Sequence, residues 1–341
     1  MRAVAITDTG RRARPAIHEL PDPDPGPGEV RVRLRASALN HLDLWAMRGI
    51  PGVEYRFPFV LGADGAGEID AVGPGVDAAR IGEEVVVNPV LSCGRCAHCV
   101  AGERPLCRRF AMLGEHRDGT HAELVILPAV GAVPRPPGLD AKDAAAGGVV
   151  YATAYRMLFT KARARPGDVC LIHGVGGGVG TAALQLAVRA GLEVVVTSSD
   201  PRKLERAREL GAAHGFNYAE GDIVAGVRAA VEAVDIVIDA VGGDVWPASF
   251  RLLRNGGRLI NCGATAGREG IVPVAHLFWR QLEVLGSTMA SDGEFRQALD
   301  AVVRNDIRPV VDREVPLDGV PEALQALARG DQFGKIVVTR P

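Results

Sequence analysis

The 341-residue sequence is poor in several features that mark particular classes of protein. Aromatic residues make up only 5% of the chain, which argues against a surface on which single-stranded nucleic acid bases stack. Neither sign of charge dominates, because 39 Lys and Arg stand against 41 Asp and Glu, and no basic block attracts nucleic acid or an anionic membrane. Apolar runs of about 18 residues, which could span a membrane, are also missing. We therefore expect no nucleic acid partner and no membrane partner.

The N-terminal segment lacks the pattern of a secretory signal. Residues 1–15 (MRAVAITDTGRRARP) contain no apolar core behind a basic start. We therefore expect a cytoplasmic protein, in a compartment where disulfides are disfavoured. Hydrophobic residues at 47% and charged residues at 23% are typical of a globular protein, and the length predicts two domains.

The first 130 residues have the pattern of β-strands. Apolar residues alternate with polar ones, or run together, between segments rich in Gly and Pro. The residues 21–28 (PDPDPGPG) predict a rigid loop, because each proline fixes φ and removes a donor, and residues 72–76 (VGPGV) predict a hairpin turn. This half is typical of a compact, partly open β-barrel. The expected strands are Arg2–Thr7, Glu29–Leu39, Gly82–Asn88 and His121–Leu127.

From about Gly167 the pattern changes to short apolar runs that alternate with helical segments. Strands of this kind are buried on both faces, which predicts a parallel sheet covered by helices and favours a doubly wound dinucleotide fold. The last forty residues return to a β pattern (FGKIVVTRP), and we expect them to rejoin the first domain. The expected strands are Val169–Gly174, Leu192–Ser198, Val234–Gly242, Gly257–Gly263 and Leu282–Ser287.

Four of the six cysteines lie within fifteen residues of one another, at Cys93, Cys96, Cys99 and Cys107. Two Cys-x-x-Cys steps and a fourth thiolate can converge on one tetrahedral zinc, and a site with four sulfurs and no open position is structural. An iron–sulfur cluster, a redox pair and four plain buried cysteines are the alternatives. The fourth cysteine of such an iron–sulfur motif is usually followed by proline, whereas Arg108 follows Cys107. Cys170 and Cys262 lie in or beside expected strands and are interpreted as small buried residues.

A glycine cluster between an expected strand and an expected helix predicts a dinucleotide site. Gly177 and Gly180 take the second and third positions of the fingerprint, and Val175 replaces the first glycine. The pyrophosphate is expected on the backbone of Gly176, Gly177, Gly178 and Val179, where the helix begins.

The end of the second strand bears on the choice between NAD(H) and NADP(H). An acid there accepts from both ribose hydroxyls of NAD and repels a 2′-phosphate. Asp200 precedes Pro201, an order typical of an N-cap followed by the first helical residue. The hydroxyls and cations that remain suit a phosphate, so NADP(H) is favoured and NAD(H) is the alternative. They belong to Ser198, Ser199, Arg202 and Lys203.

Together these motifs resemble the medium-chain dehydrogenase/reductase superfamily, whose poles are the zinc alcohol dehydrogenases and the quinone oxidoreductases. The resemblance also includes residues 39–49 (LNHLDLWAMRG), 59–73 (FVLGADGAGEIDAVG), ATAY with Thr153, FNY with Tyr218, and the terminal FGKIVV. It implies a GroES-like, partly open β-barrel catalytic domain over 1–150, with the zinc lobe at 93–107, completed by 291–341. A Rossmann domain over 151–290 binds the nicotinamide cofactor, with Thr153, Tyr218 and Gly263 among its contacts. A homodimer or homotetramer, with substrate and nicotinamide between the domains, is also implied.

The alcohol dehydrogenase pole of the family carries a catalytic zinc, and this sequence lacks its ligands. The resemblance places Asn40, Ala63 and Val149 at the three ligand positions, and Leu42 where a hydroxyl relays protons. Such a zinc needs three protein ligands and an open position, and neither Ala nor Val can ligate. His41 and Asp64 are nearby substitutes, but two neighbours make a poor tetrahedral site.

Asn40 and Asp43 instead match the NxxD of the zinc-free quinone oxidoreductases, so the candidate catalytic residues are Asn40, His41 and Asp43. Trp45 replaces the Tyr of those enzymes. Indole does not release a proton, so Trp45 is interpreted as a wall of the substrate pocket, together with Asp64 and His116. Asn40 could donate to a developing enolate oxygen, and water or His41 could supply the proton. The resemblance also offers His41 as a ligand of the cofactor pyrophosphate, the role we favour over the catalytic one.

We therefore expect an NADPH-dependent reductase of a small-molecule enone, enal or quinone, with one structural zinc and no catalytic zinc. Such substrates are already activated and accept hydride at carbon without a Lewis acid. An alcohol or aldehyde dehydrogenase with an unconventional metal site is the main alternative. A catalytically silent NADPH-binding protein is the alternative from another class, since one fold hosts many functions.

Overall fold

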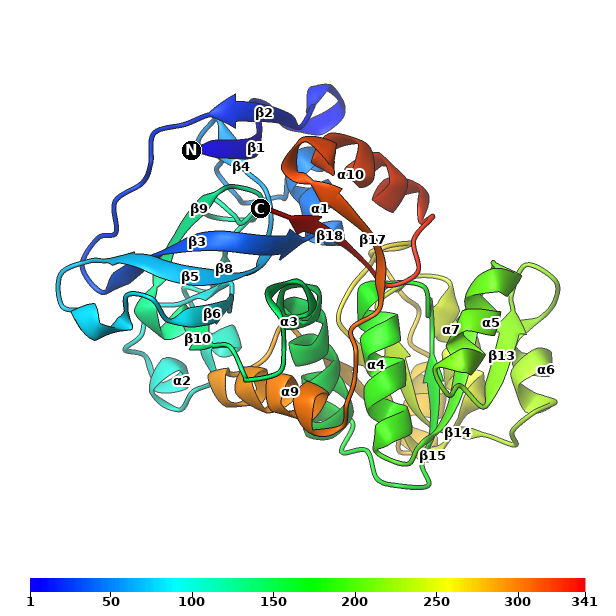
Figure 1. Ribbon diagram of the computed structural model, residues 1–341. Helices are drawn as coiled ribbons and strands as arrows, with labels where there is room; N and C mark the ends of the chain where they lie inside the picture. Colours follow the sequence, from blue (N-terminus) through cyan, green and yellow to red (C-terminus); the bar gives the residue numbers. More distant parts are fainter. Residues whose placement is uncertain (341) are drawn as a thin grey trace. The chain divides into compact units, whose positions relative to one another are not determined.

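The computed structural model describes residues 1–340; Pro341, the last residue of the segment expected to rejoin the first domain, lies outside the described residues. The chain divides into two compact units (Figure 1). Met1–Val149 and the segment from Ala290 onward form the first unit, and Val150–Met289 form the second. These boundaries differ by one residue from the expected 1–150, 151–290 and 291–341. The change from the first unit to the second lies within helix α3 (Ala141–Tyr155).

A seven-stranded sheet forms the centre of the first unit, with the order β10-β6-β5-β3-β18-β17 and with β9 also paired to β3. The long strand β3 (Glu29–Ala38) organises it, because β5 pairs along one side while β9 and β18 share the other. The C-terminal strand β18 lies antiparallel to β3, so the end of the chain pairs with a strand of the first unit (Figure 1). The other strands are β5 (Asp64–Val72), β6 (Glu84–Val87), β9 (Leu124–Pro128), β10 (Ala132–Pro134), β17 (Val311–Pro316) and β18 (Lys335–Thr339).

A second, three-stranded sheet and several helices complete this unit. Apolar side chains of α1, α10, β1 and β18 pack into one buried cluster that includes Ile6, Leu44, Leu324 and Ile336. The sheet has the order β2-β1-β4, and β7 pairs with β8 beside the cysteine segment. The elements are β1 (Arg2–Ile6), β2 (Ala16–Glu19), β4 (Phe59–Val60), β7 (Val90–Leu91), β8 (Ala111–Met112), α1 (His41–Arg48), α2 (Ala97–Val100), α9 (Asp292–Arg304) and α10 (Val320–Arg329).

The turn expected at residues 72–76 is part of a longer connection than a tight hairpin. Strand β5 ends at Val72, and a 3-10 turn at Ala78–Arg80 intervenes before β6 begins at Glu84. Backbone packing explains the difference, because a Cβ on Gly73 would lie 1.9 Å from the carbonyl oxygen of Gly26 in the proline-rich loop. The connection therefore runs against that loop before the chain turns back.

The second unit contains a six-stranded parallel sheet with the order β13-β12-β11-β14-β15-β16. This order and the helices between the strands confirm the predicted doubly wound fold. Its core includes Leu171, Val237, Phe250 and Leu259. Among residues 1–340, no helix combines the length and apolar character needed to cross a membrane. The elements are β11 (Val169–Ile172), α4 (Gly178–Arg189), β12 (Glu193–Ser198), α5 (Pro201–Glu209), β13 (His214–Asn217), α6 (Ile223–Arg228), β14 (Val234–Asp239), α7 (Val245–Leu252), β15 (Leu253–Asn261), α8 (Val274–Trp279) and β16 (Glu283–Gly286).

Candidate functional site

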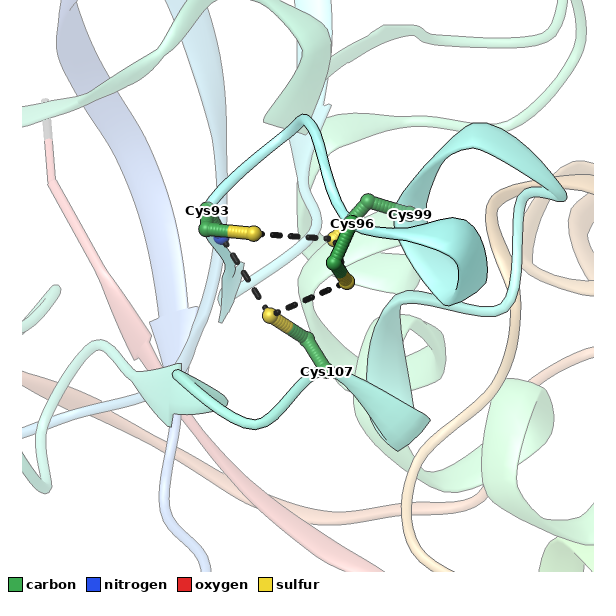
Figure 2. Close-up of side chains that lie close together, drawn as sticks. All are labelled: Cys93, Cys96, Cys99 and Cys107. Atoms are coloured by element: carbon green, nitrogen blue, oxygen red, sulfur yellow. Dashed lines mark hydrogen bonds between the residues drawn. The ribbon is translucent and has the colours of Figure 1, made fainter.

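The four clustered cysteines converge in space on one point (Figure 2). Their sulfur atoms all lie within 4.8 Å of one another, with Sγ–Sγ distances of 3.5 Å for Cys96–Cys99 and 3.9 Å for Cys96–Cys107. Four sulfurs placed about 2.3 Å from a tetrahedral zinc are separated by about 3.8 Å, so the set fits one zinc ion. These separations are far too long for disulfide bonds.

Backbone groups prepare these sulfurs for a cation. N–H groups of Arg95 and Cys96 donate to the Cys93 sulfur and lower the pKa of its thiol to about 6, whereas the neighbouring sulfurs raise the pKa of the Cys96 thiol to about 11, so the thiolate forms first at Cys93. Cys107 accepts from the N–H of Cys93 at 3.4 Å and from that of Arg109 at 3.3 Å. When bound there, zinc would cross-link a lobe that has little regular structure of its own.

A buried arginine that sequence analysis missed connects this lobe to the rest of the first unit. Arg104 lies between the third and fourth cysteines and is only 4% exposed. Its Nε donates to Asp292 Oδ1 at 2.8 Å, at the start of α9, and Asn88 Nδ2 donates to the same oxygen at 3.3 Å. The partner is 188 residues away in sequence, so no local pattern marks the contact.

The glycine loop of the second unit has the geometry predicted for a pyrophosphate site. It follows β11, and α4 begins at Gly178 with Gly177 in extended backbone as its N-cap. A Cβ on Gly180 would lie 2.8 Å from the carbonyl oxygen of Gly174, so the helix packs against the strand only with glycine there. The Lys203 side chain covers the loop, since its Nζ would be 3.2 Å from a Cβ on Gly176. The structure thus brings Gly176, Gly177, Gly178, Val179 and Lys203 together.

The residues after β12 are arranged partly as expected. Asp200 caps α5 by accepting from the N–H of Arg202 at 2.9 Å, and Pro201 is the first helical residue, which confirms the predicted cap. Asp200 also accepts from the guanidinium of Arg202, whose side chain is 86% exposed. Arg202 would therefore have to leave a carboxylate in order to bind a phosphate. Ser198 is buried and its Oγ accepts from the N–H of Asp200, while Ser199 is exposed.

Two buried polar groups of the second unit were not found from sequence. Asp239 ends β14 and accepts from the N–H groups of Val241 and Gly242, from Trp246 Nε1 and from Asn261 Nδ2, so it fixes the loop after β14. His173 follows β11, lies 3.2 Å from Thr197 Oγ1 and 2.9 Å from Ser249 Oγ, and burial lowers its pKa to about 4. The position of Asp239 at the end of an apolar strand is the one sequence signal for either.

The remaining expected cofactor contacts of the second unit lie on separate elements. Thr153 is buried in α3, and Tyr218 follows β13 with 47% of its side chain exposed. Gly263 follows β15 beside the loop after β14, where a Cβ would lie 2.9 Å from the carbonyl oxygen of Ala240. Glycine at that point permits close approach of backbone to backbone at the carboxyl edge of the sheet, where doubly wound folds bind ligands.

Asn40 and Asp64, two of the residues expected at the substrate site, meet where β3 ends. Sheet register places Ala38 opposite Asp64 on one side and opposite Val337 of β18 on the other, and Asn40 follows two residues later. Lys335 opens β18 and points its ammonium into this position. Lys335 Nζ donates to Leu39 O at 2.6 Å, to Asn40 Oδ1 at 2.6 Å and to Asp64 Oδ2 at 2.9 Å. We call Asn40, Asp64 and Lys335 the lysine cluster.

The Asn40 amide is held on both sides within this cluster. Its Nδ2 donates to Asp64 Oδ2 at 2.9 Å and, less closely, to Ala38 O at 3.3 Å. Asp64 Oδ1 accepts from the N–H of Val149 at 2.7 Å. Asp64 is 0% exposed, so it does not line an open pocket as expected. Its carboxylate instead accepts from Asn40 and Lys335.

Asp43 also has a different place from the one expected of a catalytic residue. It is 0% exposed on α1 and accepts from the N–H groups of Asn40 at 2.8 Å and Gly62 at 2.9 Å. Its Oδ2 lies 3.5 Å from Nε2 of buried His121. Asp43 therefore positions the backbone around Asn40 and is out of reach of a substrate. Asn40 is the N-cap of α1, and Asp43 follows three residues later. This is the spacing of a helix N-terminus whose side chain accepts from the N-cap backbone.

The other residues expected at the substrate site are less buried. His41 begins α1, and burial together with the positive charge of Lys335 lowers its pKa, so its imidazole is neutral at pH 7. Trp45 is half-buried on the same helix. His116 is exposed after β8, where its Nδ1 accepts from the N–H of Met112 at 3.3 Å.

Comparison with known proteins gives consistent matches across both units. Residues 26–137 match the alcohol dehydrogenase GroES-like domain, and residues 178–304 match the zinc-binding dehydrogenase domain. A zinc-type alcohol dehydrogenase-like protein of Schizosaccharomyces pombe is 32% identical over 313 residues, which cover 89% of this chain and 88% of the relative. An acryloyl-coenzyme A reductase of Metallosphaera sedula is 30% identical over 345 residues, covering 99% and 100%. The crystal structure of an NAD-dependent alcohol dehydrogenase has a TM-score of 0.93 and 43% identity over the full length of both chains.

Proposed function

The chain belongs to the zinc-type medium-chain dehydrogenase/reductase superfamily and is an NAD(P)-dependent oxidoreductase of that type, and from this premise we propose that it reduces an activated carbon–carbon double bond without a catalytic zinc. The substrate class is a small molecule in which the double bond is conjugated to a carbonyl or thioester, or a quinone. A zinc at the four cysteines is structural in this proposal.

The proposal rests on the residues at the three catalytic-zinc positions and on the contacts of the lysine cluster. Ala63 and Val149 have no side-chain ligand, and Val149 offers an N–H, which is a donor and not a metal ligand. Asn40 and Asp64 already accept from Lys335. These residues do not fit a catalytic zinc. Since an isolated carbonyl is hard to polarise without a Lewis acid, a substrate that is already conjugated is the better match.

The cofactor and the protein contribute different parts of the proposed reaction. The nicotinamide of NAD(P)H, when bound, supplies a hydride, and the β-carbon of the conjugated substrate accepts it. The double-bond electrons then move to the carbonyl oxygen as an enolate, and a proton added at the α-carbon completes the reduction. In the first unit, Asn40 can turn Nδ2 from the 3.3 Å bond with Ala38 O towards that oxygen. Neutral His41 is a poor acid, so water is the proton donor.

In the second unit, the residues at the carboxyl edge of the sheet hold the cofactor. The N–H groups that open α4 receive the pyrophosphate, and Lys203 lies over the same loop. We propose NADP(H) as the preferred cofactor, because Ser198 stands where an acid would select NAD and because Asp200 is used as a helix cap.

Alcohol or aldehyde oxidation is the second candidate. The 43% identity to a structure described as an NAD-dependent alcohol dehydrogenase favours it, and it would also reverse the proposed cofactor preference. The acryloyl-coenzyme A reductase that aligns over the whole chain favours the reductase.

A substrate panel tests the choice. NADPH or NADH consumption is followed with an acryloyl thioester, an enone, a quinone and an aldehyde, and NAD(P)⁺ reduction with a primary alcohol, each with and without a chelator that leaves the fold intact. We expect reduction of a conjugated substrate that the chelator does not change. Alcohol or aldehyde turnover that the chelator abolishes would contradict the proposal, and no turnover of any substrate would favour a silent cofactor-binding protein.

A further inference from the structure

Three buried polar side chains of the first unit form a line that includes two residues without a role in the proposed reaction. Ser37 belongs to β3, His121 precedes β9, and Asp43 lies on α1. Ser37 Oγ lies 3.0 Å from His121 Nδ1, and His121 Nε2 lies 3.5 Å from Asp43 Oδ2. The set has the composition of a Ser–His–Asp nucleophile triad. All three residues are 0% exposed, so a substrate carbonyl cannot reach the Ser37 hydroxyl and the line does not catalyse acyl transfer.

The backbone holds the His121 imidazole close to Asp43. The N–H of His121 donates to Leu61 O at 2.8 Å, and its carbonyl accepts from the N–H of Val4 at 2.7 Å. Gly62 leaves room for the ring, because its φ is +103° and a Cβ there would lie 2.9 Å from His121 Cγ. The N–H of Gly62 also donates to Asp43 Oδ1 at 2.9 Å. One segment therefore places both the imidazole and the carboxylate.

A cation from the end of the chain lies at the other end of this line. Arg340 follows β18, and its Nη2 donates to Ser37 Oγ at 3.2 Å and to Thr120 O at 3.0 Å. Burial lowers the pKa of Arg340 to about 10, which leaves the guanidinium positive at neutral pH. A guanidinium only donates hydrogen bonds, so the Ser37 oxygen is the acceptor in this contact.

The order of donors and acceptors determines where the proton of His121 lies. Because the Ser37 oxygen accepts from Arg340, the single hydroxyl proton of Ser37 is left to donate, and His121 Nδ1 accepts it. An accepting ring nitrogen carries no proton, so the imidazole proton is on Nε2 and faces Asp43. The 3.5 Å separation of Nε2 and Oδ2 is longer than an ordinary hydrogen bond, so the attraction between them is mainly electrostatic.

We propose that His121, as its Nε2–H tautomer, is a positioning residue for Asn40. It holds the Asp43 carboxylate, which in turn accepts from the N–H groups of Asn40 at 2.8 Å and Gly62 at 2.9 Å. Ser37 and Arg340 set the tautomer from the opposite side of the ring. The kinetic consequence rests on the proposed function, in which Asn40 donates to the enolate oxygen, whereas the tautomer can be measured without substrate.

Nitrogen-15 NMR of the imidazoles at pH 7 tests the tautomer. The His121 resonances are assigned by their loss in His121→Gln. We expect a protonated Nε2 and an unprotonated Nδ1 in the unmodified protein. In Arg340→Met the Ser37 oxygen is free to accept from the ring, so the Nδ1–H tautomer should appear. Arg329→Met, which breaks an exposed pair with Asp331 in the same unit, is the control and should leave the tautomer unchanged.

Two results of this measurement would overturn the proposal. One is a proton on Nδ1 of His121 in the unmodified protein, whether or not Nε2 is also protonated. The other is the same tautomer population in Arg340→Met as in the unmodified protein.

Kinetics of two substitutions test the positioning role. His121→Gln keeps an N–H donor towards Asp43 and a carbonyl acceptor for Ser37, whereas His121→Phe keeps the ring and loses both. With a conjugated substrate, kcat should fall at least about tenfold in His121→Phe while KM changes less than about twofold, because Asn40 acts mainly as charge develops on the oxygen. His121→Gln should recover most of kcat. His18→Phe, half-buried in β2, is the control and should have unchanged kcat.

The outcomes separate this inference from the proposed function. An unchanged kcat in His121→Phe, or equal losses in the Phe and Gln variants, would overturn the positioning role while the reduction itself stands. If the unmodified protein reduces no conjugated substrate, the proposed function fails, and the NMR measurement still decides the tautomer. Circular dichroism and zinc content show whether each variant folds, and the spectrum of the unmodified protein decides the question if a variant does not.

Discussion

The cysteine lobe and the lysine cluster belong to the same unit, and they deal with positive charge in opposite ways. The lobe gathers four sulfurs within 4.8 Å of one another, a closed ligand set that fits a metal ion from solution. The lysine cluster has one carboxylate, one amide oxygen and one carbonyl oxygen around an ammonium supplied by the chain. The two clusters thus differ in the number of metal-ligating side chains and in the source of the compensating positive charge.

The largest effect is expected from the lobe, where the cation comes from outside. Cys107→Ser removes one ligand of a closed four-sulfur set, so zinc content should fall well below one per chain and the free energy of unfolding should decrease by more than about 4 kcal/mol. Elemental analysis and denaturant unfolding measure the two. Cys262→Ser, outside the cluster, is the control and should retain the zinc. Full zinc content in Cys107→Ser would mean that the zinc is bound at a site other than the four cysteines.

A somewhat smaller loss is expected when the internal cation loses its carboxylate. Asp64→Asn leaves the Lys335 ammonium buried with neutral acceptors, which should cost about 3–5 kcal/mol of unfolding free energy. Glu314→Gln is the matched control, because it breaks an exposed lysine pair worth about 0–1 kcal/mol. Similar losses of unfolding free energy in the two variants, measured by urea unfolding, would show that the buried pair stabilises the fold no more than the exposed pair does.

Changing the cofactor contacts should leave both clusters untouched. Lys203→Ala combined with Ser198→Asp removes a cation over the glycine loop and adds an acid at the end of β12. NADPH binding should weaken at least tenfold more than NADH binding, or about 1.4 kcal/mol, while zinc content stays constant. An unchanged ratio of the two dissociation constants, measured by fluorescence titration, would mean that this region does not select the cofactor.

The smallest effect is a change in the titration of His41. Burial and the charge of Lys335 depress its pKa, so the neutral form is favoured in the folded state. The associated stability is present above the ordinary histidine pKa and is lost as pH falls through the depressed value. In Lys335→Met with Asp64→Asn, the pKa of His41 should rise towards its ordinary value, as followed by NMR.

His173 provides the internal control for that titration. It lies in the second unit, and its pKa of about 4 results from burial, so it should not respond to the change at Lys335. A His41 pKa that stays unchanged in the double variant would mean that the ammonium is not charged or not near the imidazole.

Sequence patterns predicted those features whose parts are close together in the chain. Cysteine spacing located the zinc lobe, and the glycine loop and the Asp200–Pro201 cap were found because a few neighbouring residues determine them. The lysine cluster could not be found in this way, because Lys335 and Asp64 are 271 residues apart and meet only through the register of β3 with β5 and β18. One charged residue at the start of the apolar strand KIVVT was the available signal.

The same reasoning explains why the roles of Asp43 and Asp64 were misassigned. Both follow motifs that indicate an active site, and both lie within a few residues of Asn40 or in the strand beside it. The burial of their carboxylates depends on His121, Val149 and Lys335, which are distant in sequence. Spacing predicts which residues gather at a site, but it does not predict which of them a substrate can reach.

The number of zinc ions that the unmodified protein binds tests the central claim most directly. Protein is equilibrated with a moderate excess of zinc, freed of loosely bound metal by gel filtration and measured by elemental analysis against amino-acid analysis. Because Ala63 and Val149 have no metal-ligating side chain, we expect a plateau at one zinc per chain, held by Cys93, Cys96, Cys99 and Cys107. A plateau at two zinc ions per chain, with the second lost on substitution of Asn40 or Asp64, would contradict the account.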